Sequence, residues 1–223
     1  MALPSSWYFA GGGLVGIGAA YLVTAFRIRA SWLALVATLV WVIPTFLIAV
    51  LVQELQAQLF VYTGIVISDS SLSWLQPVIA AAVLGARPAA YCYRTTRVAL
   101  TVEEHLQHVL VAEAKGLPWS RIALRHVFRP ALPTLLTGWL SSLRLMVGSL
   151  PLVEFLFAYP GMGQQLTLSL GLAYGDEAGL LRGDLAIGMV VAMALVLLGV
   201  EAAAGVLQQR SDPRLVELRS ESA

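Results

Sequence analysis

Five long runs of apolar residues constrain the fold of this chain more than any other feature. About 20 predominantly apolar residues are enough for a helix to cross a bilayer. The composition agrees, because 58% of the residues are hydrophobic and 12% are charged, whereas a soluble domain has about 25% charged residues. We therefore expect an all-α membrane protein with a single transmembrane domain over residues 1–223 and about five spans, at roughly 8–26, 31–52, 74–93, 131–153 and 185–207.

Basic residues are distributed unevenly between the two sides of this expected bundle. Eleven of the 14 Lys and Arg residues lie in three segments: after the first apolar run, between the third and the fourth, and after the last. Arg182 lies in a loop on the opposite side. Cytoplasmic loops carry the excess of Lys and Arg. We therefore expect the N-terminus outside and the C-terminus in the cytoplasm.

The segment of about 98–130 is polar and basic, and its pattern predicts two short helices. Gly116 is expected to end the first helix, and Pro118 suits the first turn of the second. The first helix would have an apolar face at i, i+4, i+7 and i+8, made of Val102, Leu106, Val109 and Leu110.

The second helix of this segment is expected to be amphipathic. Its apolar face combines Trp119, Ile122, Ala123 and His126, and its basic stripe consists of Arg121, Arg125 and Arg129. The pattern alone fits two interpretations: the element rests on anionic lipid headgroups, or a soluble partner recognises it.

Short motifs follow one another in a fixed order along nearly the whole chain. They are Ser31-Trp32, Ile43-Pro44-Thr45-Phe46-Leu47, Pro77 with the Arg94/Arg97 pair, Ala112-Glu-Ala-Lys-Gly116 with Leu117-Pro118, Arg125-His126-Val127-Phe128-Arg129, Val153-Glu154-Phe155 with Tyr159-Pro160-Gly161-Met162-Gly163, and Asp212-Pro213-Arg214. Together they resemble the inner-membrane permeases of the dipeptide, oligopeptide and nickel branch of ABC importers. Members of that branch normally have six spans, and this chain begins where the second would, so the first helix is expected to be missing.

The resemblance implies a type I importer permease in the bacterial inner membrane. Its partners would be a second homologous permease chain, two cytoplasmic ATPase subunits, an extracytoplasmic substrate-binding protein and membrane lipid, with no nucleic acid. The chain itself would be no enzyme and would bind no cofactor, because ATP and Mg would bind to the ATPases. The ATPase-coupling loop would include Ala112, Ala114, Lys115, Gly116, Leu117, Pro118, Arg121, Arg125, His126 and Arg129.

The solute and the activity are less constrained by the sequence. Peptides, a related small solute or nickel are the expected cargoes, and a non-transporting membrane scaffold or degenerate permease fragment is the alternative. Imidazole suits nickel, but His105, His108 and His126 all fall on the expected cytoplasmic side. We therefore expect solvated or interfacial histidines and no metal site.

Two sets of charges lie inside the expected spans. Arg87 and Glu201 each lie about six residues from the cytoplasmic end of a span, so equal depth predicts a buried ion pair, with snorkelling to the interface as the alternative. Arg144 lies roughly 20 Å deep, where an arginine costs about 2.5–3.5 kcal/mol. No acidic residue is expected at its depth, so Arg144 is predicted to face a translocation path, with an ion pair across a subunit interface as the alternative.

The loop of about 154–166 is expected to make a tight turn on the outer side. Glu154, Pro160, Gly161 and Gly163 are its candidate functional residues. The turn would serve as an outer gate or as a docking surface for the binding protein. The alternative is an ordinary re-entrant turn, because proline and glycine by themselves only set the backbone.

Overall fold

The computed structural model describes residues 6–26, 31–64, 75–172 and 182–211, and this part of the chain is helical with no strand. The element order is α1 (Ser6–Ala25), α2 (Ser31–Val42), α3 (Thr45–Thr63), α4 (Leu75–Glu104), α5 (Gln107–Ala114), α6 (Trp119–Ile122), the π-helix η1 (Ala123–Phe128), α7 (Arg129–Leu156), α8 (Met162–Ser169) and α9 (Gly183–Ser211). The all-α prediction is confirmed.

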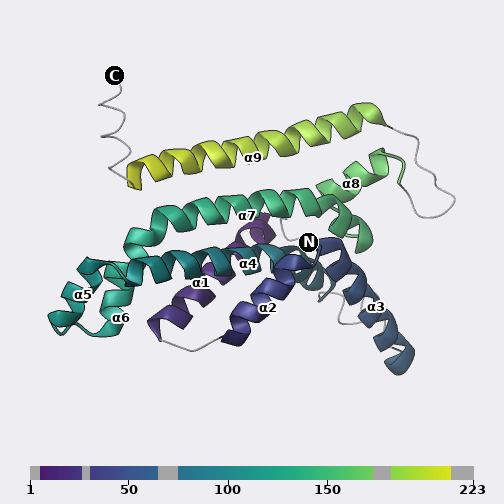
Figure 1. Ribbon diagram of the computed structural model, residues 1–223. Helices are drawn as coiled ribbons and strands as arrows, with labels where there is room; N and C mark the ends of the chain where they lie inside the picture. The colour runs from purple at the N-terminus through teal and green to yellow at the C-terminus, as the bar shows by residue number, and fades with distance from the viewer. Residues whose placement is uncertain (1–5, 27–30, 65–74, 173–181, 212–223) are drawn as a thin grey trace, which may run out of the picture.

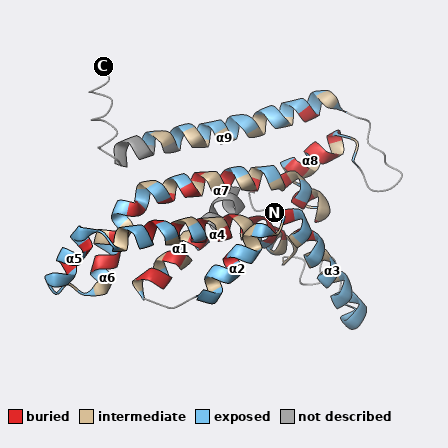
Figure 2. Cartoon of the chain, in the orientation of Figure 1, coloured by how far each residue is buried: buried red, intermediate tan, exposed pale blue. Residues whose placement is uncertain are grey.

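The helices α4 and α7 form the centre of the bundle (Figure 1). α1 and α2 pack against α4, whereas α9 packs against α7 and α8. α5 and α6 lie at one end of the bundle, called the loop end below, and α8 lies at the opposite end. Figure 2 shows that burial concentrates on α4 and α7, while α3 and α9 are largely exposed.

The second expected span is wrong as a single helix. The chain breaks at Pro44, which has an extended backbone (φ −60°, ψ 141°) and precedes the first residue of α3. Proline has no N–H and clashes with the preceding helical turn, so α2 ends at Val42 and α3 continues to Thr63, beyond the expected end of the span. The side-chain amide of Gln53 donates a hydrogen bond to the Leu156 carbonyl, which ties α3 to the end of α7.

Three helical stretches are long and apolar enough to cross a membrane among the described residues: Thr45–Thr63, Trp119–Leu156 and Gly183–Ala203. Large apolar side chains are exposed along α3 and α9. Apolar surface of this extent marks contact with lipid or protein. α4 is 30 residues long, but Arg87, Arg94 and Arg97 interrupt its apolar character. The exact limits of the five spans remain a prediction.

Candidate functional site

The turn after α5 is a Schellman motif with Gly116 at its centre. The Gly116 N–H donates to the Glu113 carbonyl at 2.9 Å, and the Leu117 N–H donates to the Ala112 carbonyl at 3.4 Å. Gly116 has a φ of +73°, in the left-handed region that glycine adopts without a steric penalty. Pro118 then precedes the first residue of α6. The predicted role of Gly116 at the end of the first helix is confirmed, whereas Pro118 lies at the N-cap, one residue before the first turn in which the sequence places it.

The second short helix is continuous with α7, which the sequence did not indicate. α6 runs into η1, and η1 runs into α7, so one helical rod extends over Trp119–Leu156. The rod's loop end has the predicted amphipathic division. Ile122 and Ala123 are buried, Trp119 and His126 are half-buried, and Arg121, Arg125 and Arg129 are exposed.

The inner face of this loop end is fastened to the bundle. A buried apolar cluster joins α4, α5, α6, η1 and α7; its most deeply buried members are Leu100, Val109, Ile122 and Val127. The Trp119 indole N–H donates to the Thr24 carbonyl at 3.1 Å, and the Arg97 guanidinium donates to the Thr24 hydroxyl. The last turn of α1 therefore anchors both α4 and α6.

The outer face of the loop end is open. Ala114, Lys115, Gly116 and Pro118 are exposed, and Leu117 is half-buried. Together with the exposed arginines of the rod they form a basic surface on the side of these elements that faces away from the apolar cluster. Ala112 is the exception among the candidate coupling residues, because it is 4% exposed and belongs to the cluster.

The predicted apolar face of the first short helix is wrong. Helix α4 ends at Glu104 and α5 begins at Gln107, so the helical register is interrupted within the supposed face. Val102, Leu106 and Leu110 are exposed, and only Val109 of the four is buried. His105 and His108 are exposed and His126 is half-buried, and the His108 ring Nε2 lies 2.8 Å from the His126 carbonyl oxygen. Among the described residues, no group of three or more metal-binding side chains comes together.

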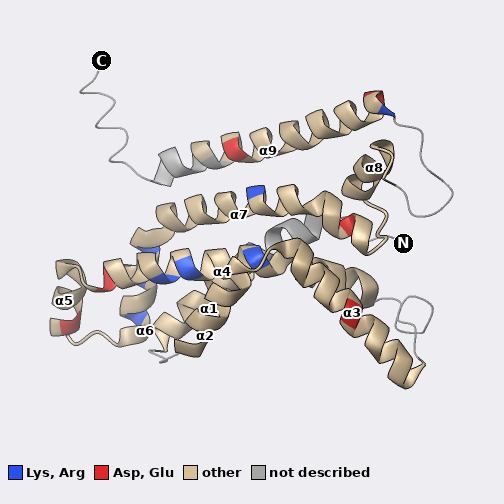
Figure 3. Cartoon of the chain, turned by 45° about the vertical axis from the view of Figure 1, so that its right-hand side comes forward, with Lys and Arg blue, Asp and Glu red and all other residues tan. Residues whose placement is uncertain are grey.

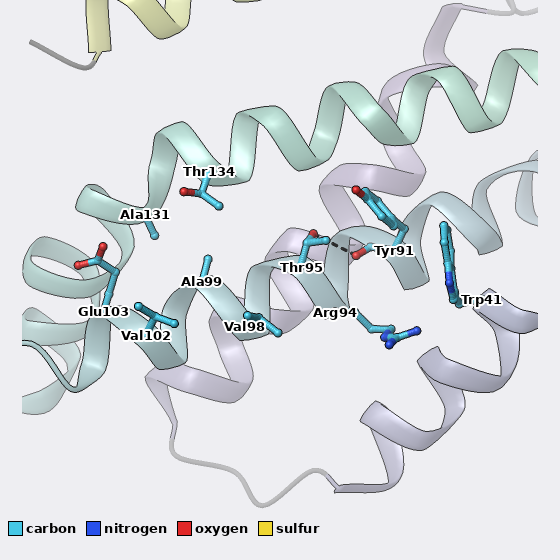
Figure 4. Close-up of a pocket in the computed structure, with 10 residues that line it drawn as sticks. All are labelled: Trp41, Tyr91, Arg94, Thr95, Val98, Ala99, Val102, Glu103, Ala131 and Thr134. Atoms are coloured by element: carbon cyan, nitrogen blue, oxygen red, sulfur yellow. Dashed lines mark hydrogen bonds between the residues drawn. The ribbon is translucent and has the colours of Figure 1, made fainter. Parts of the chain in front are cut away.

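A cavity of about 570 Å³ lies between α4 and α7 next to the loop end. Figure 4 shows it bordered by α4 and by the first turns of α7, with Trp41 at one side. Its lining is mixed: it contains the charged residues Arg94 and Glu103 as well as apolar ones. Ala99 and Ala131 line this cavity and also belong to the apolar cluster. The cavity and the loop end therefore share a wall.

At the opposite end, Glu154 fastens helix α8. Glu154 is 6% exposed, and its Oε2 accepts the backbone N–H groups of Gly163 at 2.7 Å and Gln164 at 3.1 Å. A carboxylate at a helix N-terminus satisfies unpaired donors and is favoured by the helix dipole. Glu154 is thus a cap for α8, a role that sequence reasoning missed.

The two glycines of this turn leave room for Glu154. A Cβ on Gly161 would lie 2.3 Å from the Glu154 carboxylate, and a Cβ on Gly163 would lie 2.6 Å from Pro151 Cα. In the sequence, the feature that could have indicated this cap is the pair of glycines, Gly161 and Gly163, that follows Glu154. Pro160 is exposed.

The predicted ion pair between Arg87 and Glu201 is wrong. The Arg144 Nε donates to Glu201 Oε1 at 2.5 Å, while Arg87 Nε donates to the Trp41 carbonyl at 3.3 Å and its guanidinium lies 5.1 Å from the centre of the Trp41 ring. α9 packs against α7, so equal depth does not bring Glu201 to Arg87 on α4. The expectation that no acidic residue lies near Arg144 is also wrong. Figure 3 shows how sparse charge is along α7 and α9.

Comparisons with known proteins agree with this architecture. The chain is 27% identical over 215 residues to a protein of Brucella suis biovar 1 (strain 1330) named provisionally as a peptide transport system permease, with 91% of this chain and 63% of that protein covered. It is 33% identical over 112 residues to the dipeptide transport system permease protein DppB of Haemophilus influenzae, covering 46% and 33% of the two chains. The chain thus spans less than two thirds of the length of these relatives.

The fold has a solved counterpart. A chain of the MetNI methionine ABC transporter, in inward-facing conformations, superposes with a TM-score of 0.51 at 17% identity, covering 95% of this chain and all of that one. At this identity the match shows the fold alone. Residues 12–217 match the family described as "Binding-protein-dependent transport system inner membrane component". Because that match covers nearly the whole chain, this protein belongs to the family of binding-protein-dependent transport system inner membrane components.

Proposed function

We propose that this chain is a permease subunit of an ATP-driven importer, that it carries peptides or related small solutes, and that it couples to separate ATPase subunits through its loop end. In this proposal a second permease chain completes the path, and ATP and Mg bind only to the ATPases. The loop end faces the cytoplasm. We favour peptides over nickel because the relatives named above belong to peptide systems.

One observation carries the proposal: the loop end is anchored on its inner face and open on its outer face. Ile122 and Val127 are 1% and 0% exposed, whereas Arg121 and Arg125 on the opposite face are exposed. Anchored apolar packing transmits displacement because protein interiors are close-packed and compress little. A soluble partner that binds the basic face would therefore move α4 and α7 together with the cluster.

The continuity of α6, η1 and α7 gives this displacement a direction. A push on the outer face acts along the 38-residue rod Trp119–Leu156 rather than on a separate small helix. The cavity between α4 and α7 shares Ala99 and Ala131 with the moving cluster. We expect the cavity to widen and narrow with the position of the loop end, as the inner half of an alternating-access path.

The α8 end would act on the outer side. Glu154 holds the first turn of α8 against the end of α7, so α8 moves with α7 as long as this contact persists. We propose that α8 and the turn at Pro160 form an outer gate or the docking surface of a substrate-binding protein. A displacement of α7 that begins at the loop end would then reach this surface through the same helix.

Co-purification and a matched pair of variants test the proposal. The wild-type chain should bring ATPase subunits with it in mild detergent. In proteoliposomes, Gly116→Val should assemble but lose substrate-stimulated ATP hydrolysis, because a β-branched residue is strained at positive φ. Gly116→Asn should retain stimulation, because asparagine tolerates the left-handed region.

Two results would count against this function. A chain that purifies without ATPase subunits would be better described as a scaffold. Equal stimulation in Gly116→Val and wild type would show that the Schellman turn does not participate in coupling.

A further inference from the structure

We infer that Arg144 and Glu201 form a recognition site for a zwitterionic solute whose apolar side chain lodges in the adjacent cavity between α7, α8 and α9. This inference rests on the proposed import function and specifies the chemistry of its solute. The solute class is a short apolar peptide with free termini. Its carboxylate would bind Arg144, and its ammonium group would bind Glu201.

The position of the pair is the first reason. Arg144 is the only charged residue over 130–153, and Glu201 is the only one over 185–209. Arg144 lies about 22 Å from the start of α7 and about 18 Å from its end at 1.5 Å per residue. Even so, 59% of the Arg144 side chain and 39% of the Glu201 side chain are exposed. Charges at such depth face water or protein rather than lipid.

The unused hydrogen-bonding capacity of the pair is the second reason. One hydrogen bond, from Arg144 Nε to Glu201 Oε1, joins the two side chains. Within the described residues, the two terminal nitrogens of Arg144 and the second oxygen of Glu201 make no other hydrogen bond. A guanidinium presents its donors as a fork that matches a carboxylate. The pair therefore offers a donor fork and an acceptor oxygen side by side.

The neighbouring cavity is the third reason. It has a volume of about 310 Å³ and an apolar lining that includes Leu143, Val147, Leu197 and Val200. Leu143 adjoins Arg144 in the sequence, Val200 adjoins Glu201, and the other two lie about one turn away. Met162 of α8 also lines the cavity, whereas Arg144 and Glu201 adjoin lining residues in the sequence and are not part of the lining themselves. A ligand with charges at one end and an apolar side chain at the other fits this arrangement.

A zwitterionic lipid headgroup would offer similar charges, but the depth of the site disfavours it. Headgroups lie at the edges of a hydrocarbon core of about 30 Å, whereas both charged residues lie well inside their helices. A peptide that moves through a path passes the middle of the membrane. The solute is therefore the better occupant.

The test uses the full transport complex in nanodiscs and a leucyl-leucine probe with a photoreactive leucine side chain. Probes with an acetylated N-terminus or an amidated C-terminus each lack one charge. Wild type should label residues of α7 and α9 at the cavity, with each blocked probe about tenfold weaker, as expected for a lost charge-assisted hydrogen bond. Glu201→Gln should abolish the discrimination against the acetylated probe only, and Arg144→Gln should abolish that against the amidated probe only.

Two further variants test whether these particular charges bind the probe. Arg182→Gln, at an exposed arginine before α9, is the matched control and should label like wild type. The charge-reversed double variant Arg144→Glu with Glu201→Arg preserves an ion pair, and it should keep the fold while losing labelling by free leucyl-leucine. Equal labelling by free and blocked probes, or full labelling of the reversed pair, would overturn the site and leave a structural ion pair.

ATP-dependent uptake of leucyl-leucine by the same complex separates this inference from the proposed function. Uptake without labelling of the cavity overturns the site while the importer proposal stands. Charge-selective labelling without ATP-dependent uptake supports the site and overturns the importer proposal.

Discussion

The turn at Gly116 and the turn at Gly161 and Gly163 lie at opposite ends of the bundle and depend on glycine for different reasons. Gly116 has a φ of +73°, but a Cβ there would meet no atom within 4 Å. Gly161 has an extended backbone (φ −133°), yet a Cβ there would overlap the Glu154 carboxylate, and one on Gly163 would overlap Pro151. At the loop end, glycine is needed for its left-handed backbone conformation. At the α8 end, glycine is needed because the neighbouring atoms leave no room for a Cβ.

This difference bears on how each end moves. A Schellman turn holds its shape through its own backbone hydrogen bonds, so it can be displaced as a rigid unit together with the apolar cluster to which Ala112 belongs. The α8 turn is held by contacts with α7, which a displacement must either carry along or break. We therefore expect the α8 turn to respond to substitutions of its neighbours on α7, and the shape of the Gly116 turn to respond to substitutions within the turn itself.

The largest expected effect belongs to Gly163→Ala. Its Cβ would lie 2.6 Å from Pro151 Cα and 2.8 Å from Pro151 N, so backbone must shift, and we expect a loss of about 3 kcal/mol in unfolding free energy, at the upper end for overpacking. The measurement is reversible unfolding in mixed micelles. Because the clash is with backbone, Glu154→Ala should not relieve it. A loss below about 1 kcal/mol would show that the space at this turn is not limiting.

A double-mutant cycle between Gly161 and Glu154 should give the next largest effect. Gly161→Ala alone should cost about 2 kcal/mol, because the Glu154 carboxylate must leave the N–H groups of Gly163 and Gln164. In the Glu154→Ala background the atoms in the way are absent, so the same substitution should cost less than about 0.5 kcal/mol. Additive losses would mean that Gly161 is needed for some reason other than room for this carboxylate.

Local features of these turns were predictable from sequence, and contacts between distant segments were not. Gly116 and Pro118 act on their own backbone, so their residue types indicate a turn directly. The cap formed by Glu154 depends on which way α8 folds back over α7, which no spacing rule specifies. Arg87 and Glu201 show the same limit: depth along a helix follows from residue counts, but α7 rather than α4 is the neighbour of α9.

The break at Pro44 shows a different limit. Residues 31–52 contain no charged residue, and hydropathy favours one span across them, whereas the backbone cost of an internal proline favours two helices. Proline is tolerated inside some helices, and α4 contains Pro88 while α7 contains Pro133 and Pro151. The sequence therefore does not distinguish a proline that ends a helix from one that a helix retains.

The smallest expected effect tests the conformational requirement at the loop end. Gly116→Ala should cost about 1 kcal/mol in unfolding free energy, since an L-residue is disfavoured in the left-handed region by roughly 1–2 kcal/mol and the loss of chain flexibility offsets part of this. Gly116→Asn should cost only a few tenths of a kcal/mol, because asparagine enters this region readily. Both side chains enter open space, so any difference between them reports conformation and not packing. Equal costs for alanine and asparagine would indicate that a neighbouring residue crowds position 116. The two turns would then no longer differ in the way proposed.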